Sequence, residues 1–106
     1  RHKIAEMASR VEMCKEFNYS IAKRLNDGGY VVKEASMSKL LSTKMADEVI
    51  YDALQLLGGY GYMEEYPMAR LLRDSRLGPI GGVTSEILRE IIAKIIIDKK
   101  EYKSVT

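Results

Sequence analysis

Two short segments of this 106-residue chain have residue types that bind ligands through the backbone. The first is an apolar run that ends in a glycine pair and consists of Gln55, Leu56, Leu57, Gly58 and Gly59. The second begins another apolar run and consists of Thr84, Ser85 and Glu86. Glycines end helices, but they also let a ligand approach the backbone. The first N–H groups of a helix lack intrahelical partners and suit polar or anionic groups. Each segment therefore has a purely structural interpretation and a ligand-binding one.

Other kinds of chemistry have little support in the composition. His2 and Cys14 are the only histidine and cysteine, so ligand number excludes a conventional zinc site. A single cysteine forms no internal disulfide, which fits a reducing compartment such as the cytoplasm or the mitochondrial matrix. Cys14 falls on an apolar helix face, and we expect it to be a small buried side chain. Glu64 and Glu65 precede Pro67 and are expected to be exposed turn carboxylates rather than an acid–base pair.

The charge and the hydropathy of the chain argue against two classes of partner. The 17 basic and 15 acidic residues are mixed along the sequence, and the net charge is +2. No basic stripe therefore indicates nucleic-acid binding. No apolar run approaches the roughly 20 residues that a membrane-spanning helix needs. We expect a globular domain with no nucleic-acid partner and no membrane span.

Helices must position the two segments, because apolar residues recur every three or four positions through most of the chain. The predicted helices cover about residues 3–26, 33–57, 67–76 and 84–99. Gly28 suits the left-handed position after the first helix, and the Gly58–Gly59 pair ends the second. Pro67 fits the first turn of the third helix, and Thr84 or Ser85 can cap the last one.

These helices predict an all-α fold: an antiparallel hairpin, a bent connection and a closing helix. The closing helix carries isoleucines on more than one face, so we expect more protein to cover it and the chain to associate with itself. The chain starts at Arg1 with a helical pattern already running by Ile4, which we interpret as a fragment or a processed product. The neighbours Arg73 and Asp74 are expected to form a structural ion pair.

Three stretches of the chain together carry a family resemblance. They are AEMASRVEM, EASMSKLLSTKMADEVIYDA and ALQLLGGYGYMEEYPMARLLRDSRLGPIGGVTSEILREIIAKIII. The combination of QxxGGxGY, the arginine–aspartate pair and the TSE helix start closely resembles the C-terminal helical domain of the flavin-dependent acyl-CoA dehydrogenases. The resemblance extends over about residues 3–97.

The resemblance implies an incomplete up-down four-helix bundle. Residues 1–106 would form part of the C-terminal bundle domain, without its first helix and without the N-terminal helical and middle β-domains. Such enzymes bind FAD and form homo-oligomers, either dimers or tetramers. They oxidise an acyl-CoA thioester to the 2,3-enoyl-CoA: a carboxylate takes the α-proton, and a hydride passes from the β-carbon to the flavin. Electrons then leave to an electron-transfer flavoprotein.

The resemblance also implies residue roles. Cofactor-binding positions would be Gln55, Leu56, Leu57, Gly58, Gly59, Thr84, Ser85 and Glu86. The first five would approach the adenosine-diphosphate part of a neighbouring subunit's FAD, and the last three would lie against FAD. Val83 would face the substrate thioester.

The sequence departs from the family at the loop before the last helix. Many members carry the catalytic glutamate there, in a pattern like YEGTSE, whereas here Gly82 occupies that place. The long-chain and isovaleryl branches resemble this chain in that respect and take the base from an earlier helix, which would precede Arg1. Loss of the dehydrogenase activity is the other explanation. Gly81 and Val83 also differ from the usual aromatic and glycine, which alters the substrate pocket.

A non-catalytic interaction module is the competing class of function. Bundle helices look alike by periodicity, so the apolar stripes fit a self-associating helical module equally well. The two flavin-side segments favour the enzyme, because a plain bundle does not need them. The isolated chain is expected to be inactive, since none of its residues matches the base.

Overall fold

The computed structural model describes residues 1–102, and its regular elements are all helices. The helices are α1 (His2–Asn26), α2 (Val32–Leu57), α3 (Gly59–Tyr62), α4 (Pro67–Arg76) and α5 (Ser85–Asp98). The predicted all-α fold is confirmed, and the four predicted helices begin and end within one or two residues of the observed ones. The short helix α3 was not predicted.

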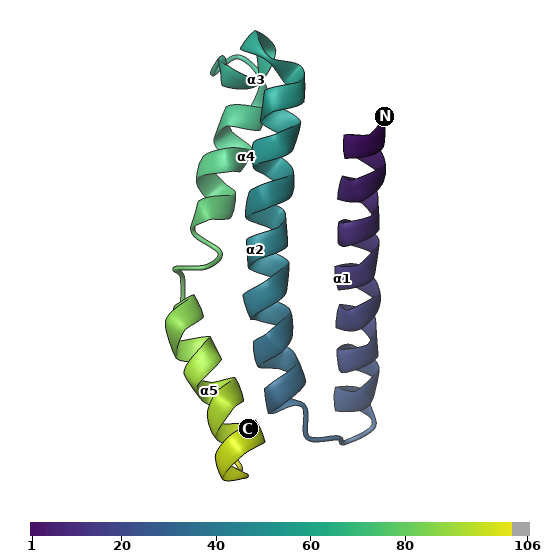
Figure 1. The fold of residues 1–106 in the computed structure, drawn as a ribbon, viewed down its shortest axis with the longest axis vertical. Coiled ribbons are helices and arrows are strands. Elements are labelled where there is room, and N and C mark those ends of the chain that lie inside the picture. The colour runs from purple at the N-terminus through teal and green to yellow at the C-terminus, as the bar shows by residue number, and fades with distance from the viewer. Residues whose placement is uncertain (103–106) are drawn as a thin grey trace.

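Helix α2 is the centre of the molecule (Figure 1). Helix α1 runs antiparallel to it on one side, and α4 and α5 run back along its other side. In the described part of the chain, α1 packs against α2 alone, whereas α3, α4 and α5 all contact α2. The result is an elongated open layer of 49 × 25 × 24 Å rather than a closed bundle.

The turn between α1 and α2 forms as the glycines predict. Gly28 has φ +83°, and its N–H donates to the carbonyl of Leu25 at 3.0 Å. The N–H of Gly29 donates to the carbonyl of Arg24 at 2.8 Å. These bonds satisfy carbonyls that the end of a helix otherwise leaves without partners. The chain can therefore reverse within five residues and bring α2 alongside α1.

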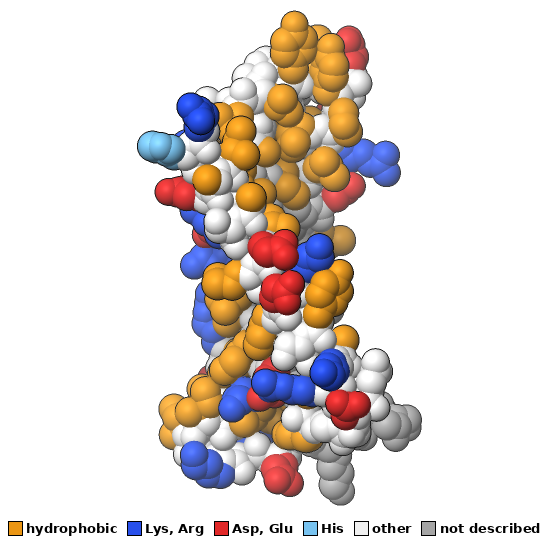
Figure 2. All heavy atoms as spheres, turned by 90° about the vertical axis from the view of Figure 1, so that its right-hand side faces the viewer, with side chains coloured by type: hydrophobic (Ala, Val, Ile, Leu, Met, Phe, Trp, Pro, Cys, Tyr) orange, Lys and Arg blue, Asp and Glu red, His pale blue; other side chains and the backbone are white. Residues whose placement is uncertain are grey.

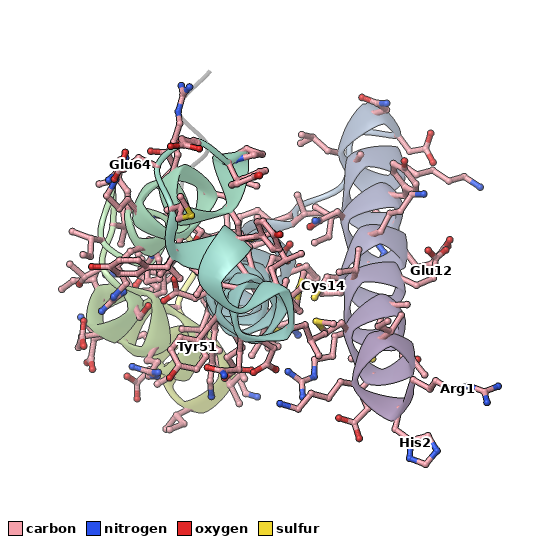
Figure 3. All side chains as sticks on the ribbon, turned by 90° about the horizontal axis from the view of Figure 1, so that it is seen from above. Arg1, His2, Glu12, Cys14, Tyr51 and Glu64 are labelled. Carbon is pink, nitrogen blue, oxygen red and sulfur yellow. The ribbon has the colours of Figure 1, made fainter. Side chains whose placement is uncertain are left out.

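The contact between α1 and α2 buries little surface. The α1 side chains that are half-buried in it include Met7, Cys14, Phe17 and Ile21. Cys14 extends from α1 toward α2, while Glu12 points away (Figure 3). The expectation of a buried Cys14 is wrong, because only one helix covers this face and the thiol stays partly accessible. Other members of the predicted apolar stripe are exposed: Ile4, Val11 and Leu25.

Polar contacts tie α1 to α2 as well. Ser38 is 8% exposed, and its hydroxyl donates to the Asn18 side chain. Arg10 pairs with Glu48 at 3.4 Å on the surface. The hydrophobic residues that are buried among residues 1–102 are Val31, directly before α2, and Leu88 in α5, and neither is completely buried. The core is therefore thin and lies along α2.

Helix α3 forms because Gly61 lets the chain fold back on the end of α2. A Cβ at Gly61 would lie 2.6 Å from the carbonyl oxygen of Leu54 and 3.1 Å from its Cγ. Above this contact, the rings of Tyr60 and Tyr66 meet edge to face with centroids 5.3 Å apart. The sequence suggested a simple helix stop here, since four residues are too few to show a helical period.

The predicted ion pair between Arg73 and Asp74 is wrong. Arg73 pairs with Glu64 at 2.7 Å, and Asp74 pairs with Arg70 at 3.5 Å. Adjacent residues on a helix point in different directions, whereas residues four apart share a face. The hydrogen bond from Arg73, together with its positive charge, lowers the pKa of the Glu64 carboxyl.

Replacing Gly61 with alanine is expected to destabilise the fold by about 2 kcal/mol, because the new Cβ would overlap the Leu54 carbonyl and force the backbone to move. Urea-induced unfolding followed by circular dichroism measures the change. Gly59→Ala is the matched control, since a Cβ there meets no atom within 4 Å. Equal stability of the two variants would contradict this account of α3.

Replacing Arg73 with alanine is expected to raise the pKa of Glu64 toward that of an unpaired glutamate. Because folding lowers this pKa, the ion pair stabilises the fold at pH values above the pKa of an unpaired glutamate. This stabilisation is lost as the pH falls through the lowered pKa of the folded state. NMR titration of the Glu64 carboxyl carbon tests this. Arg70→Ala, which breaks the separate pair with Asp74, should leave the titration of Glu64 unchanged.

Candidate functional site

One stripe of polar residues on α2 holds the connection between α4 and α5. Lys39, Thr43 and Asp47 are spaced four residues apart and so lie on one face of the helix. The ammonium of Lys39 donates to the carbonyls of Gly81 and Val83, at 2.6 and 2.8 Å. We call these three residues the polar stripe.

The other two members of the polar stripe contact the chain just before this loop. Asp47 accepts a hydrogen bond from the Ser75 hydroxyl at 3.3 Å and pairs with Arg76 at 3.6 Å. Thr43 lies against Gly78, where a Cβ would come within 3.1 Å of the threonine methyl carbon. The end of α4 and the loop that follows it are therefore fixed on successive turns of α2.

Gly82 lies at the bend of this loop, and it occupies the place where the resemblance led us to expect a glycine instead of the catalytic glutamate. It has φ +75°, a conformation that residues with a side chain rarely adopt. A Cβ at Gly82 would also come within 3.4 Å of the Lys39 ammonium nitrogen. From residue 81 to residue 83 the loop thus presents carbonyl groups and no carboxylate, so no group there can accept the α-proton of a substrate.

The start of α5 has the geometry that the sequence predicted. Thr84, not Ser85, is the N-cap, and its hydroxyl accepts a hydrogen bond from the Ile87 N–H at 3.4 Å. Helix geometry leaves the N–H groups of Ser85 and Glu86 without intrahelical acceptors. Both residues line an open groove of about 400 Å³ that Lys44 and Arg89 also line. This helix start can therefore donate hydrogen bonds to a polar ligand.

The other predicted segment, residues 55–59, lies at the end of α2 and the start of α3, and all five residues are exposed. Gly58 has φ +62° and ψ −132°, and its N–H donates to the carbonyls of Leu54 and Gln55 at 3.1 and 3.2 Å. A Cβ added at Gly58 or at Gly59 would meet no atom within 4 Å. Figure 2 shows hydrophobic side chains gathered at this end of the molecule.

The structure does not bring the two predicted segments together. Ser85 and Glu86 share a groove with Leu40 and Lys44 of α2, whereas residues 55–59 form the far end of that helix and the start of α3 (Figure 1). At about 1.5 Å of rise per residue, the helix separates them by roughly 20 Å. No single ring system or phosphate group can contact both segments of one chain.

A larger open groove, of about 500 Å³, contains none of the predicted site residues. Its charged residues include Arg10, Asp47, Glu48 and Arg76, which form ion pairs across it at 3.4 and 3.6 Å. Both basic residues of this groove are therefore engaged by carboxylates, and Asp52 adds a further negative charge. Among residues 1–102 no cluster of histidine, cysteine, aspartate or glutamate could hold a metal ion. No helix within the same range is long and apolar enough to cross a membrane.

Sequence reasoning missed the role of Lys39. A lysine on a helix ordinarily extends into solvent, and neither of its acceptors is a side chain, so no residue type in the loop marks the contact. Two features of the sequence could have indicated this contact. The residues of the polar stripe are spaced four apart beside an apolar stripe, and glycines at positions 78, 81 and 82 allow the loop to approach α2.

Comparison with known proteins gives a consistent result. Residues 1–97 match the family described as acyl-CoA dehydrogenase, C-terminal domain. An acyl-CoA dehydrogenase of Bacillus subtilis is 43% identical over 95 residues, which is 90% of this chain and 25% of that protein. The mitochondrial isovaleryl-CoA dehydrogenase of Bos taurus is 38% identical over 92 residues, 87% of this chain and 22% of that protein. Long-chain relatives match as well.

A crystal structure agrees with the sequences. The acyl-CoA dehydrogenase from Geobacillus kaustophilus superposes with a TM-score of 0.88 at 38% identity, over 91% of this chain and 25% of that one. The chain thus spans about a quarter of the length of the relatives that it matches. Because the family match covers nearly all of the described residues, the chain belongs to the acyl-CoA dehydrogenase family and corresponds to its C-terminal domain.

Proposed function

We propose that this chain is part of the C-terminal bundle of a flavin-dependent acyl-CoA dehydrogenase, which oxidises an acyl-CoA thioester to the 2,3-enoyl-CoA. The observation that carries the proposal is the family match over residues 1–97. The relatives are about four times as long as the chain, so other domains supply the remaining cofactor and substrate contacts. The chain alone is inactive, because it offers no base at the loop.

The exposed glycines are suited to FAD. Gly58 needs to be glycine for its positive φ, and Gly61 for its contact with Leu54. Gly59 meets neither condition: nothing in the described chain lies within 4 Å of where its Cβ would be. Without a side chain, the backbone at Gly59 is open to a partner outside this chain, which is what a cofactor that contacts the backbone would need.

Residues at the start of α5 would hold a second part of the cofactor site. The N–H groups of Ser85 and Glu86 are available to polar cofactor atoms, and Thr84 fixes their orientation by capping the helix. When bound, FAD supplies the acceptor for the hydride that leaves the β-carbon. Val83, which is 37% exposed, would lie beside the substrate thioester. The α-proton would go to a carboxylate outside this chain, since Gly82 has no side chain.

Two subunits would share each cofactor site. The roughly 20 Å between the segments means that they serve different parts of the site. The resemblance assigns residues 55–59 to the adenosine-diphosphate part of a neighbouring subunit's FAD, together with a homo-oligomer, either dimer or tetramer. Electrons would pass to an electron-transfer flavoprotein, in the cytoplasm or the mitochondrial matrix.

Replacing Gly59 with alanine is expected to weaken FAD binding about tenfold, because a methyl group would stand where the cofactor approaches the backbone. Fluorescence titration of the flavin-free protein with FAD measures the affinity. The unfolding free energy of the flavin-free variant should stay within about 0.5 kcal/mol of the parent, since the methyl group meets nothing in the chain. Unchanged FAD affinity would remove Gly59 from the proposed site.

The visible spectrum of the protein that contains this chain tests the activity directly. The flavin band should bleach when a suitable straight- or branched-chain acyl-CoA is added anaerobically, because the hydride reduces the flavin. Free coenzyme A, which has no acyl chain to oxidise, is the control. A protein that binds no flavin would favour the self-associating helical module instead.

A further inference from the structure

We propose that Lys39 is a positioning residue that sets the conformation of the loop leading into α5. We call its two hydrogen bonds to the Gly81 and Val83 carbonyls the Lys39 clasp. The clasp itself is inferred from geometry alone. Its consequence for substrate and cofactor rests on the proposed function.

The two acceptors explain why a lysine suits this position. The carbonyls belong to residues on either side of Gly82, and both bind one ammonium nitrogen, at 2.6 and 2.8 Å. An ammonium has three donors on one atom and can bind two carbonyls that converge, and charge-assisted bonds of this length are strong. No carboxylate lies within ion-pair distance of Lys39 among residues 1–102, so the loop carbonyls do not compete with an acidic side chain.

The clasp also accounts for the backbone at Gly82. When two carbonyls that flank one residue turn toward the same nitrogen, the chain between them must arch, and Gly82 does so with φ +75°. A side chain at this position would start 3.4 Å from the Lys39 nitrogen. The loop therefore disfavours a side chain at residue 82 through its backbone angle, and a Cβ there would be in van der Waals contact with the clasp.

Other contacts fix the first half of the loop but not the second. The carbonyl of Leu77 accepts the N–H groups of Ile80 and Gly81, at 3.0 and 2.6 Å, and Gly78 lies against Thr43. Of these polar contacts, only the clasp reaches Val83, the residue directly before the Thr84 cap. Loss of the Lys39 ammonium should therefore loosen residues 82–86 selectively and leave α4 in place.

For a dehydrogenase, this makes Lys39 a determinant of substrate binding that need not touch the substrate. Val83 and the first N–H groups of α5 follow the clasp directly in the chain. If the clasp opens, these groups lose their fixed position, while the base, which is not in this loop, keeps its own. The Michaelis constant for acyl-CoA should then rise more than kcat falls.

Amide hydrogen exchange tests the clasp in the flavin-free protein that contains this chain. Lys39→Met keeps the length of the side chain and removes the charge. It should speed exchange of the Ile87 and Leu88 amides, which donate to the hydroxyl and the carbonyl of Thr84, by about tenfold or more. Lys39→Arg should restore part of the protection. Lys23→Met is the control: Lys23 is an exposed lysine of α1 that makes no ion pair within residues 1–102, and its loss should change nothing in the loop.

A double-mutant comparison gives an independent readout. Gly82→Ala strains a backbone angle that the clasp holds in place, so it should destabilise the protein less when Lys39 is already methionine and the loop can relax. Gly28→Ala has a similar positive φ, with nothing within 4 Å, and its effect should be the same in both backgrounds.

Unchanged exchange in Lys39→Met would overturn the proposal, and so would faster exchange spread evenly over all helices. Additive effects of Lys39→Met and Gly82→Ala would also count against it. Localised exchange in a protein that binds no flavin would confirm the clasp and refute the proposed function. Localised exchange with an unchanged Michaelis constant in an active enzyme would confine Lys39 to a purely structural role and overturn its place in substrate binding.

Discussion

The packing of every other helix against α2 is the constraint on which the structure depends. Helix α1 has no other neighbour in the described chain, and α4 and α5 reach the same helix from its opposite side. Since the buried hydrophobic core is thin, polar contacts carry much of the specificity of this arrangement. The polar stripe decides where α4 ends, how the loop bends and where α5 begins. A single face of one helix thus connects the fold to the candidate substrate loop.

Different glycines of the chain are required for different physical reasons, although in the sequence they all look like helix breakers. Gly58 and Gly82 have positive φ, whereas Gly61 permits close packing on a carbonyl. Gly59 has neither requirement inside the chain. Only the structure separates these cases, because in the sequence all of these glycines simply lie at or between the ends of helices. The distinction matters for the proposed function, because Gly59 can be replaced without a clash in the described chain and so can be tested for ligand contact separately from stability.

The helices themselves could be predicted closely, because apolar residues at helical spacing and end signals such as Gly28, Pro67 and Thr84 act locally. The role of Lys39 could not, since it depends on a contact across more than forty residues to backbone atoms that carry no sequence signal. The pairing of Arg73 could not be predicted from adjacency, because neighbouring residues of a helix point in different directions and its partner Glu64 lies nine residues away. The partial exposure of Cys14 shows the same limit, because periodicity identifies an apolar face but not how many neighbours cover it.

The length of α2 between its contact with the start of α5 and its final turn sets the distance between residues 84–86 and residues 55–59. Each residue inserted into this part of the helix would shift the far end by about 1.5 Å and rotate it by about 100°, which would turn residues 55–59 away from their present direction. Insertions in the connections around Glu65 would not have this effect, because they lie outside the helix that sets the spacing. Changes of chain length in this domain are therefore tolerable in the connection around Glu65 and not in the middle of α2.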